Sequence, residues 1–321
     1  MSGVKHRIRD GLITVLFVSG AVILITHLLG WFAELTHRPV GQFVAIDGLR
    51  LHYLRKGSGQ PVVFLHGNDG LLQDFMVSVI DRAAKGYQAI AMDRPGHGYS
   101  ERPWFEVATA EVQARIIHKA LQKLGIKKPI LVGHSWSGAL VLAYALRYPD
   151  DLNGIVLLSG VAYDNPRLKP KTSDFLLQLP IIGDLLAPLY AISERRELTQ
   201  TLEEAFAPGQ APGWYVDTCA SLMLRPDQIK AYAQDQVTIR GTVRALSPHY
   251  QELRLPMVIV TGDQDKNVPP EQHAYLLSSA VAQADLVVLP GAGHYIELTR
   301  PRVVMDAIDK IAKCSTSQGS R

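Results

Sequence analysis

The sequence contains little cysteine and shows little imbalance of charge. Only two cysteines occur among 321 residues, Cys219 and Cys314, and no Cys-x-x-Cys pair is present, so neither a disulfide framework nor a zinc site is indicated. The net charge of +3 arises from 33 basic and 30 acidic residues, which differs from the strongly basic balance of nucleic-acid-binding proteins. The His-Glu-x-x-His, Walker and dinucleotide-binding motifs are also missing. We therefore expect no nucleic-acid partner, no metal and no organic cofactor.

Charged residues are absent from one long segment near the N-terminus. Between Gly11 and Ala33 there is no Asp, Glu, Lys or Arg, and the segment is almost wholly apolar. About 20 such residues in a helix cross a bilayer. Because Lys5, Arg7 and Arg9 precede the segment, the positive-inside rule predicts a single-pass helix with a cytoplasmic N-terminus and the rest of the chain on the outer, periplasmic or extracytoplasmic side. The alternative is a cleaved signal peptide, but its apolar region is normally shorter, and no clear cleavage site follows this one.

After this segment, short apolar runs alternate with stretches of helical periodicity. Runs such as 61–66 and 129–134 are typical of buried parallel strands, and helical periodicity is clear in 111–125. The alternation predicts an α/β fold with a doubly wound, mostly parallel sheet and helices on both faces. We expect residues 1–38 to form the N-terminal tip and transmembrane helix, and residues 39–321 to form the α/β domain.

One long stretch contains only helical patterns. No strand is predicted between Ser159 and Pro256, and the stretch is too long for a loop. It predicts a helical lid, at about residues 160–255, that lies over the ends of the strands. Proline and glycine should divide this lid into short helices. The residues expected to interrupt it are Pro180, Pro188, Pro208, Pro212 and Gly213.

A candidate nucleophile lies between a predicted strand and a predicted helix. The motif Gly133-His134-Ser135-Trp136-Ser137-Gly138 has the strand–turn–helix context of a nucleophile elbow. The sharp turn requires small residues two positions before and two after the serine. Gly133 and Ser137 meet this requirement, although Ser137 replaces the usual glycine. A simple left-handed turn is the alternative interpretation of the motif alone.

Two later loops offer the groups that a serine nucleophile needs. A serine hydroxyl needs a positioned base, and the base needs a carboxylate that fixes its tautomer. His294 lies in a glycine-rich loop after the last predicted strand, and it alone among the 11 histidines lies in such a loop near the C-terminus. The loop after the preceding strand contains Asp263 and Asp265.

From about Gln42 to Ile311 the sequence resembles the α/β-hydrolase fold family, in its lidded single-domain branch. The resemblance is carried by DGLRLHY, FLHGN, DRPGHGYS, GHSWSG, GDQDKNVP and PGAGHYIELTRP, which occur in the family's order. It implies a triad of Ser135 as nucleophile, His294 as base and Asp265 as acid. Asp263 is the alternative acid, although we expect it to cap the turn.

The same chemistry requires two backbone donors for a developing oxyanion. One should be the N–H of Trp136, directly after the nucleophile. The resemblance implies that the other is the N–H of Asn68, in the His-Gly-Asn sequence after an early strand. We interpret His66 as structural and the DRPGHGYS segment as a packing turn, with His97 as a less favoured second-shell polar group.

A serine nucleophile favours acyl chemistry over the epoxide and haloalkane chemistry that family members with an aspartate nucleophile perform. The expected reaction is the cleavage of a small carboxylic ester by a serine carboxylesterase or lipase-like enzyme. A lipid-derived ester is favoured by the membrane helix and by apolar lid residues that would line the pocket, unless they only pack the lid onto the core. The alternatives are an amidase, a carbon–carbon bond hydrolase, a perhydrolase or a ligand-binding receptor. The apolar lid residues are Phe175, Leu176, Leu177, Leu179, Ile181, Ile182, Leu185 and Leu186.

Overall fold

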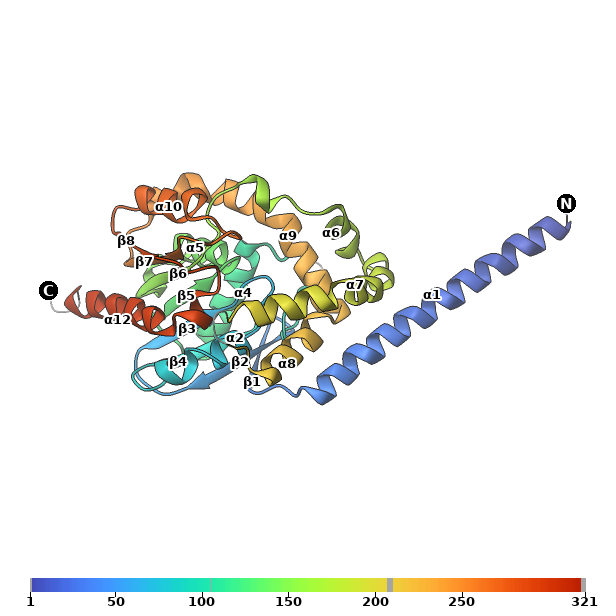
Figure 1. The fold of residues 1–321 in the computed structure, drawn as a ribbon, viewed down its shortest axis with the longest axis horizontal. Helices are drawn as coiled ribbons and strands as arrows, with labels where there is room; N and C mark the ends of the chain where they lie inside the picture. The colour runs from blue at the N-terminus through green and yellow to red at the C-terminus, as the bar shows by residue number, and fades with distance from the viewer. Residues whose placement is uncertain (1, 105, 207–209, 319–321) are drawn as a thin grey trace.

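The computed structural model describes residues 2–104, 106–206 and 210–318. At its centre is a sheet of 8 strands in the order β1-β2-β4-β3-β5-β6-β7-β8 (Figure 1). β2 pairs antiparallel with β1 and β4, and the other neighbours are parallel. This mixed, mostly parallel sheet confirms the predicted α/β architecture. The strands are β1 (Gln42–Ile46), β2 (Leu49–Lys56), β3 (Pro61–Leu65), β4 (Gln88–Met92), β5 (Ile130–His134), β6 (Gly154–Leu158), β7 (Met257–Gly262) and β8 (Ala284–Leu289).

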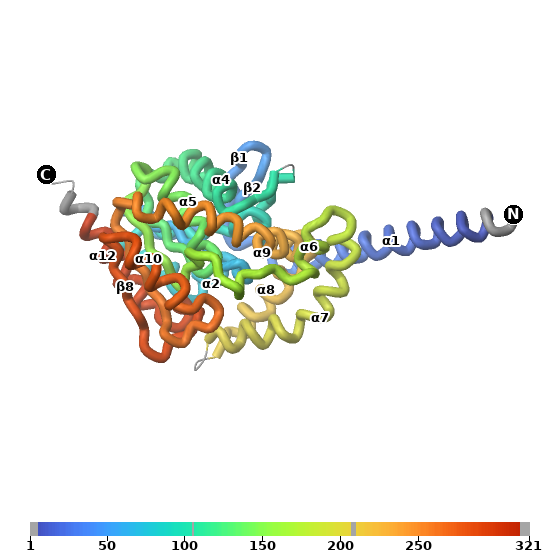
Figure 2. The backbone as a smooth tube through the Cα atoms, turned by 90° about the horizontal axis from the view of Figure 1, so that it is seen from above, coloured from blue at the N-terminus to red at the C-terminus, as the bar shows by residue number. Residues whose placement is uncertain are grey.

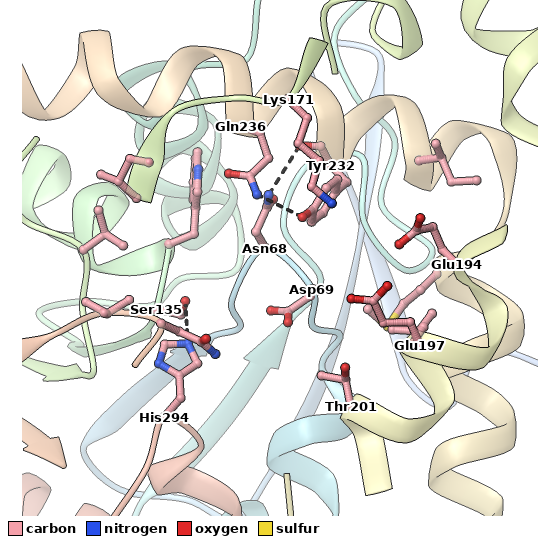
Figure 3. Close-up of a pocket in the computed structure, with 18 of the residues that line it drawn as sticks. Asn68, Asp69, Ser135, Lys171, Glu194, Glu197, Thr201, Tyr232, Gln236 and His294 are labelled. Carbon is pink, nitrogen blue, oxygen red and sulfur yellow. Dashed lines mark hydrogen bonds between the residues drawn. The ribbon is translucent and has the colours of Figure 1, made fainter. Parts of the chain in front are cut away.

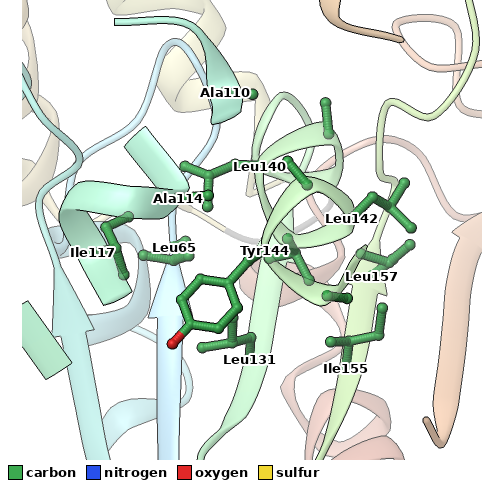
Figure 4. Packing of buried hydrophobic residues seen from close by; sticks show 14 of the residues in the cluster. Leu65, Ala110, Ala114, Ile117, Leu131, Leu140, Leu142, Tyr144, Ile155 and Leu157 are labelled. Atoms are coloured by element: carbon green, nitrogen blue, oxygen red, sulfur yellow. The ribbon is translucent and has the colours of Figure 1, made fainter. Parts of the chain in front are cut away.

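Successive side chains of the central strands point to opposite faces, and each face is covered by helices. Val63 and Leu65 belong to a core cluster with α4 and α5 (Figure 4). Val62 and Phe64 belong to a second cluster, with α3 and α12. Because both faces are buried, the strands read as continuous apolar runs. The covering helices are α2 (Gln73–Met76), α3 (Ile80–Ala83), α4 (Ala110–Lys123), α5 (Ser137–Arg147), α10 (Ala274–Ala280), α11 (Ile296–Thr299) and α12 (Pro301–Gln318). Short 3-10 turns are η1 (Pro149–Asp151), η2 (Pro166–Leu168), η3 (Ser247–Glu252) and η4 (Pro270–Gln272).

A helical insertion joins β6 to β7 and lies at one end of the body (Figure 2). It contains α6 (Thr172–Leu177), α7 (Ile182–Glu204), α8 (Gly213–Met223) and α9 (Pro226–Leu246). Among the described residues of this segment there is no strand, as the sequence predicts.

The prediction that Pro188 interrupts the insertion is wrong. Pro188 lies inside α7, which continues for 23 residues. Ala187 and the neighbouring Tyr190 pack with Ile229 of α9 in one apolar cluster, and this packing holds the helix together across the missing N–H. Pro180 and Pro212 do lie outside helices, while Pro208 lies outside the described residues.

The N-terminal segment forms one long helix, α1 (Ser2–Thr36), which extends away from the body (Figures 1 and 2). Residues His6–Thr36 are long and apolar enough to cross a membrane, and an 18-residue window within them has a mean hydropathy of 2.4. The last part of α1 contacts α7, α8 and α9.

Candidate active site

Ser135 occupies a strained turn between β5 and α5. Its φ is 53°, in the left-handed region that non-glycine residues seldom adopt. A Cβ at Gly133 would lie 2.6 Å from the backbone oxygen of Ser137 and 2.7 Å from Val141 Cγ2. Only glycine therefore fits at position 133, and the turn has the crowded backbone of a nucleophile elbow.

Ser137 explains why the motif can depart from its usual glycine. Its side chain is buried, and its hydroxyl donates a hydrogen bond to the backbone oxygen of His66. The hydroxyl thus links the elbow to the loop after β3, where Asn68 lies.

Ser135, His294 and Asp265 form a continuous hydrogen-bonded chain. His294 Nε2 lies 2.9 Å from Ser135 Oγ, and His294 Nδ1 lies 2.9 Å from Asp265 Oδ2. The three side chains come from the loops after β5, β7 and β8, which are parallel strands whose carboxyl ends meet at one edge of the sheet. The structure therefore brings together the residues that the sequence points to.

The surroundings distinguish Asp265 from Asp263. The second oxygen of Asp265 accepts hydrogen bonds from the N–H groups of Asn267 at 2.9 Å and Val268 at 2.8 Å. Burial would raise the pKa of the Asp265 carboxyl, but the hydrogen bonds from His294 and Val268 outweigh it and hold that pKa below its usual value. Asp263 is exposed and instead accepts a hydrogen bond from Gly291 N–H at 2.8 Å, in the loop before His294.

The two expected oxyanion donors come from two segments, the loop after β3 for Asn68 and the start of α5 for Trp136. Neither Asn68 N–H nor Trp136 N–H donates a hydrogen bond to another group in the described part of the chain. The side chains, by contrast, are held in place: Trp136 Nε1 donates to the Asp235 backbone oxygen at 3.2 Å, and Asn68 Nδ2 donates to the Tyr232 backbone oxygen at 3.3 Å. Both tethers run to α9 of the insertion.

A buried arginine supports the same loop. Arg94 donates hydrogen bonds to the backbone oxygens of His66 at 3.1 Å and Gly67 at 3.0 Å, and its guanidinium lies 4.2 Å from the centre of the Trp136 ring. Its charge is balanced by Asp235, whose Oδ2 is 2.7 Å from Arg94 Nη1.

Asp235 connects several buried polar side chains around Arg94. It also accepts hydrogen bonds from Arg102 at 2.7 Å and Gln113 at 2.9 Å, and it lies 3.0 Å from His97 Nε2. Burial would raise the pKa of the Asp235 carboxyl, but Arg102 and Arg94 hold it well below its usual value. His66 and His97 thus support the loop, and the DRPGHGYS segment is more than a packing turn because it supplies Arg94.

A second histidine lies directly behind the triad. His134 Nε2 is 3.2 Å from the backbone oxygen of His294, and His134 Nδ1 is 3.2 Å from Glu297 Oε1. Burial lowers the pKa of His134 to about 3 and raises that of Glu297 well above its usual value. The His134 side chain is therefore neutral at pH 7.

The triad opens into a pocket of about 510 Å³ between the strand ends and the insertion. Ser135 and His294 lie on one side, and Glu194, Glu197 and Thr201 of α7 face them from the other (Figure 3). Apolar side chains also line the pocket: Trp136, Val161, Leu168, Leu198, Met223, Leu224, Ile229 and Val268.

Comparisons with known proteins agree with this geometry. A family model described as the alpha/beta hydrolase family matches residues 62–307. The chain belongs to this family.

Characterised members of the alpha/beta hydrolase family differ in what they act on. The chain is 26% identical, over 82% of its length and 93% of the relative, to 2-hydroxy-6-oxo-6-phenylhexa-2,4-dienoate hydrolase of Burkholderia cepacia. It is also 26% identical to Lipase 1 of Psychrobacter immobilis, over 77% of the chain and 76% of that protein. A thermophilic esterase from Thermogutta terrifontis has the same fold, with a TM-score of 0.68 and 23% identity over 86% of this chain and 99% of that one. These similarities identify the chain as a hydrolase.

Two features of this alpha/beta hydrolase differ from the sequence analysis. The eight apolar residues expected to line the pocket are not among the residues that do, and five of them are exposed on the outside of the insertion. Asp235 was missed, although one signal could have found it. Asp235 lies four residues after Ala231 and four before Ile239, a helical spacing that places its carboxylate on the buried face of α9.

Proposed function

We propose that this protein is a serine hydrolase that cleaves a carboxylic ester through an acyl-enzyme on Ser135. The observation that carries the proposal is the Ser135–His294–Asp265 chain, with 2.9 Å at each step. The geometry matches the roles of nucleophile, base and orienting carboxylate. The strained elbow and the two unoccupied N–H donors support the same assignment.

In the proposed mechanism, Ser135 Oγ attacks the ester carbonyl carbon while its proton passes to His294 Nε2. The carbonyl oxygen becomes an oxyanion that accepts hydrogen bonds from Asn68 N–H and Trp136 N–H. The C–O bond to the alcohol then breaks, and the imidazolium gives its proton to the leaving oxygen. Water, deprotonated by the same imidazole, then attacks the acyl carbon. The bond from that carbon to Ser135 Oγ breaks, the imidazolium returns the proton to Ser135 Oγ, and the acid is released. Asp265 stays ionised throughout and stabilises the imidazolium.

The N-terminal helix supports a membrane-bound form of this enzyme. We propose that α1 anchors the chain as a single-pass helix, with the basic N-terminus in the cytoplasm and the catalytic domain outside. A lipid-derived ester is then an accessible substrate. The division into residues 1–38 and 39–321, with a lid at about 160–255, stays a prediction; α9 packs over the elbow and α7 forms the far wall of the pocket, as a lid would.

A carbon–carbon bond hydrolase is the second candidate. Relatives that act on dienoates favour it, and such substrates carry a carboxylate. Arg167, Lys171 and Lys266 line the pocket and could bind an anionic group. The same cations could bind an anionic lipid ester, so they do not by themselves distinguish the two reactions.

The two reactions can be separated with purified full-length protein in detergent. We expect turnover of p-nitrophenyl esters of short and medium chain length, and much slower turnover of a 2-hydroxy-6-oxo-dienoate. The Ser135→Ala variant should turn over neither substrate. Fast cleavage of the dienoate with weak ester turnover would reverse the order of the candidates. No turnover of any acyl substrate by folded protein would contradict both.

A further inference from the structure

Exposed apolar side chains are concentrated on one part of the insertion. Seven large apolar side chains of α6, the α6–α7 turn and the outer face of α7 are between 40% and 77% exposed, and we call them the apolar tip. Elsewhere on the body, exposed apolar residues such as Phe43, Trp104 and Leu276 are scattered. Exposed apolar side chains gathered on one part of a protein normally have a partner. The apolar tip consists of Phe175, Leu176, Leu179, Ile181, Ile182, Leu189 and Ile192.

The apolar tip lies on the side of the body from which α1 leaves. Both views show α6 and α7 on the side of the body that faces the extended helix (Figures 1 and 2). Specific contacts fix this arrangement. His27 Nε2 lies 3.8 Å from Asp184 at the start of α7, and Glu34 forms an ion pair with Arg225 before α9. The position of the tip relative to a membrane therefore follows from the position of α1.

The length of the uncharged segment sets the depth. A hydrocarbon core of about 30 Å needs about 20 helical residues at 1.5 Å each, so a core that begins near Gly11 extends to about Gly30. His27 lies within that span, and its partner Asp184 lies next to Ile181 and Ile182 of the tip. The start of α7, with Ile181 and Ile182, is therefore level with the outer boundary of the bilayer, at the depth of interfacial helices, which is about 5–10 Å.

We propose that the apolar tip docks into the outer leaflet of the membrane that α1 spans, so that the pocket receives lipid-derived substrate directly from the bilayer. The proposal rests on the membrane anchoring and ester chemistry proposed above. Charge supports a lipid partner: Arg195 and Arg196 follow Ile192 on the outer face of α7, and within the described residues neither forms an ion pair. Arginines at this position can reach lipid phosphates.

One face of α7 carries residues of the apolar tip, and another face of the same helix lines the pocket. Leu189 and Ile192 are exposed on the outer face of α7, whereas Tyr190, Glu194 and Glu197 line the pocket. An ester that leaves the outer leaflet beside α7 therefore has a short path to Ser135, without crossing bulk water.

The first test measures depth with single fluorophores on full-length protein in vesicles whose acyl chains carry nitroxide quenchers. In a Cys314→Ser background, with Cys219 buried, labels are placed by Ile192→Cys, by Phe17→Cys on α1 and by Leu276→Cys. Leu276, on α10 at the far end of the body, is 48% exposed and serves as the matched control. We expect quenching at positions 192 and 17, and none at 276.

Each other outcome has a separate meaning. Quenching at 17 but not at 192 would overturn the docking and leave the anchor intact. No quenching at 17 would overturn the anchor and the docking with it. If the label at 192 is shielded from aqueous iodide but is not quenched by the lipid nitroxide, a protein partner and not the bilayer covers the tip, and the docking proposal is wrong. None of these readouts requires enzyme activity, so they are independent of the proposed chemistry.

The second test compares Ile192→Asp with Leu276→Asp on two substrates. Ile192 does not line the catalytic pocket, so turnover of a water-soluble short-chain ester should stay within about twofold for both variants. On an ester embedded in vesicles, Ile192→Asp should be slower by about tenfold, the factor given by about 1.4 kcal/mol of lost binding, and Leu276→Asp should match the unmodified protein. Unchanged vesicle activity of Ile192→Asp, or an equal loss on both substrates, would contradict the docking.

Discussion

The triad edge of the sheet and the helical insertion differ in what determines their structure. At the triad edge, backbone crowding and buried hydrogen bonds determine the residue types and their conformations. Gly133 has no room for a Cβ, and both carboxylate oxygens of Asp265 accept hydrogen bonds. In the insertion, α7 crosses Pro188 without ending and leaves Leu189 and Ile192 exposed. Short motifs therefore specify the first region, whereas packing against other surfaces specifies the second.

The largest expected effect tests whether the triad edge is as specific as this comparison requires. Asp265→Asn should lower turnover by about 10⁴-fold, because an amide neither fixes the productive tautomer of His294 nor stabilises the imidazolium. Asp263→Asn is the matched control and should change turnover by less than about threefold, since Asp263 only caps the loop at Gly291. Steady-state kinetics on one ester would measure both, and a reversal of the two results would assign the acid to Asp263.

The next prediction concerns the ion pair that connects the insertion to the triad edge. Asp235→Ala should reduce the free energy of unfolding by about 3–5 kcal/mol, because it leaves the buried Arg94 without its counterion. Asp285→Ala breaks the half-exposed Asp285–Lys310 pair and should cost less than about 1 kcal/mol. Chemical denaturation in detergent would compare them. Equal, small losses would mean that the insertion is not held to the triad edge by this pair.

A pH-dependent effect, smaller for each pH unit, concerns Asp74, which accepts a hydrogen bond of 2.8 Å from Tyr215 of α8. Burial outweighs this hydrogen bond and raises the pKa of the Asp74 carboxyl to about 8. Above about pH 4 the unfolded chain therefore loses a proton that the folded chain keeps, so stability falls as pH rises towards 8, by at most about 1.4 kcal/mol per pH unit.

Asp74→Asn should remove this slope, because an amide does not titrate in that window. The measurement is the free energy of unfolding of both proteins at several pH values between about 5 and 8. Parallel curves for the two proteins would show that Asp74 is ionised in the folded state.

The smallest effect concerns the departure from glycine in the elbow. Ser137→Gly removes the hydroxyl that donates to the His66 oxygen, which still accepts from Arg94. We expect a loss of about 1 kcal/mol of stability and turnover within a few-fold. Abolished activity would mean that Ser137 orders the Asn68 loop more strongly than the shared acceptor suggests.

The structure of the triad edge was predictable from the sequence, whereas that of the insertion was predictable only in part. The mostly parallel sheet, the elbow and the placement of His294 beside Ser135 were predictable, because parallel strands bring their carboxyl ends to one edge. The position of the apolar lid residues was not. An apolar stripe has the same spacing whether it lines a pocket, packs on a core or faces a membrane, so Ile181 and Ile182 needed the structure to be placed.

The most direct test of the central claim is covalent labelling with a fluorophosphonate. The probe reacts with a serine whose hydroxyl is activated by a neighbouring base and whose product oxygen lies among oxyanion donors, and it requires no knowledge of the substrate. We predict that folded full-length protein is labelled at Ser135, that Ser135→Ala is not labelled, and that His294→Ala is labelled at least about 10²-fold more slowly. Labelling at another serine, or no labelling of folded protein, would contradict the assignment of Ser135 as the nucleophile.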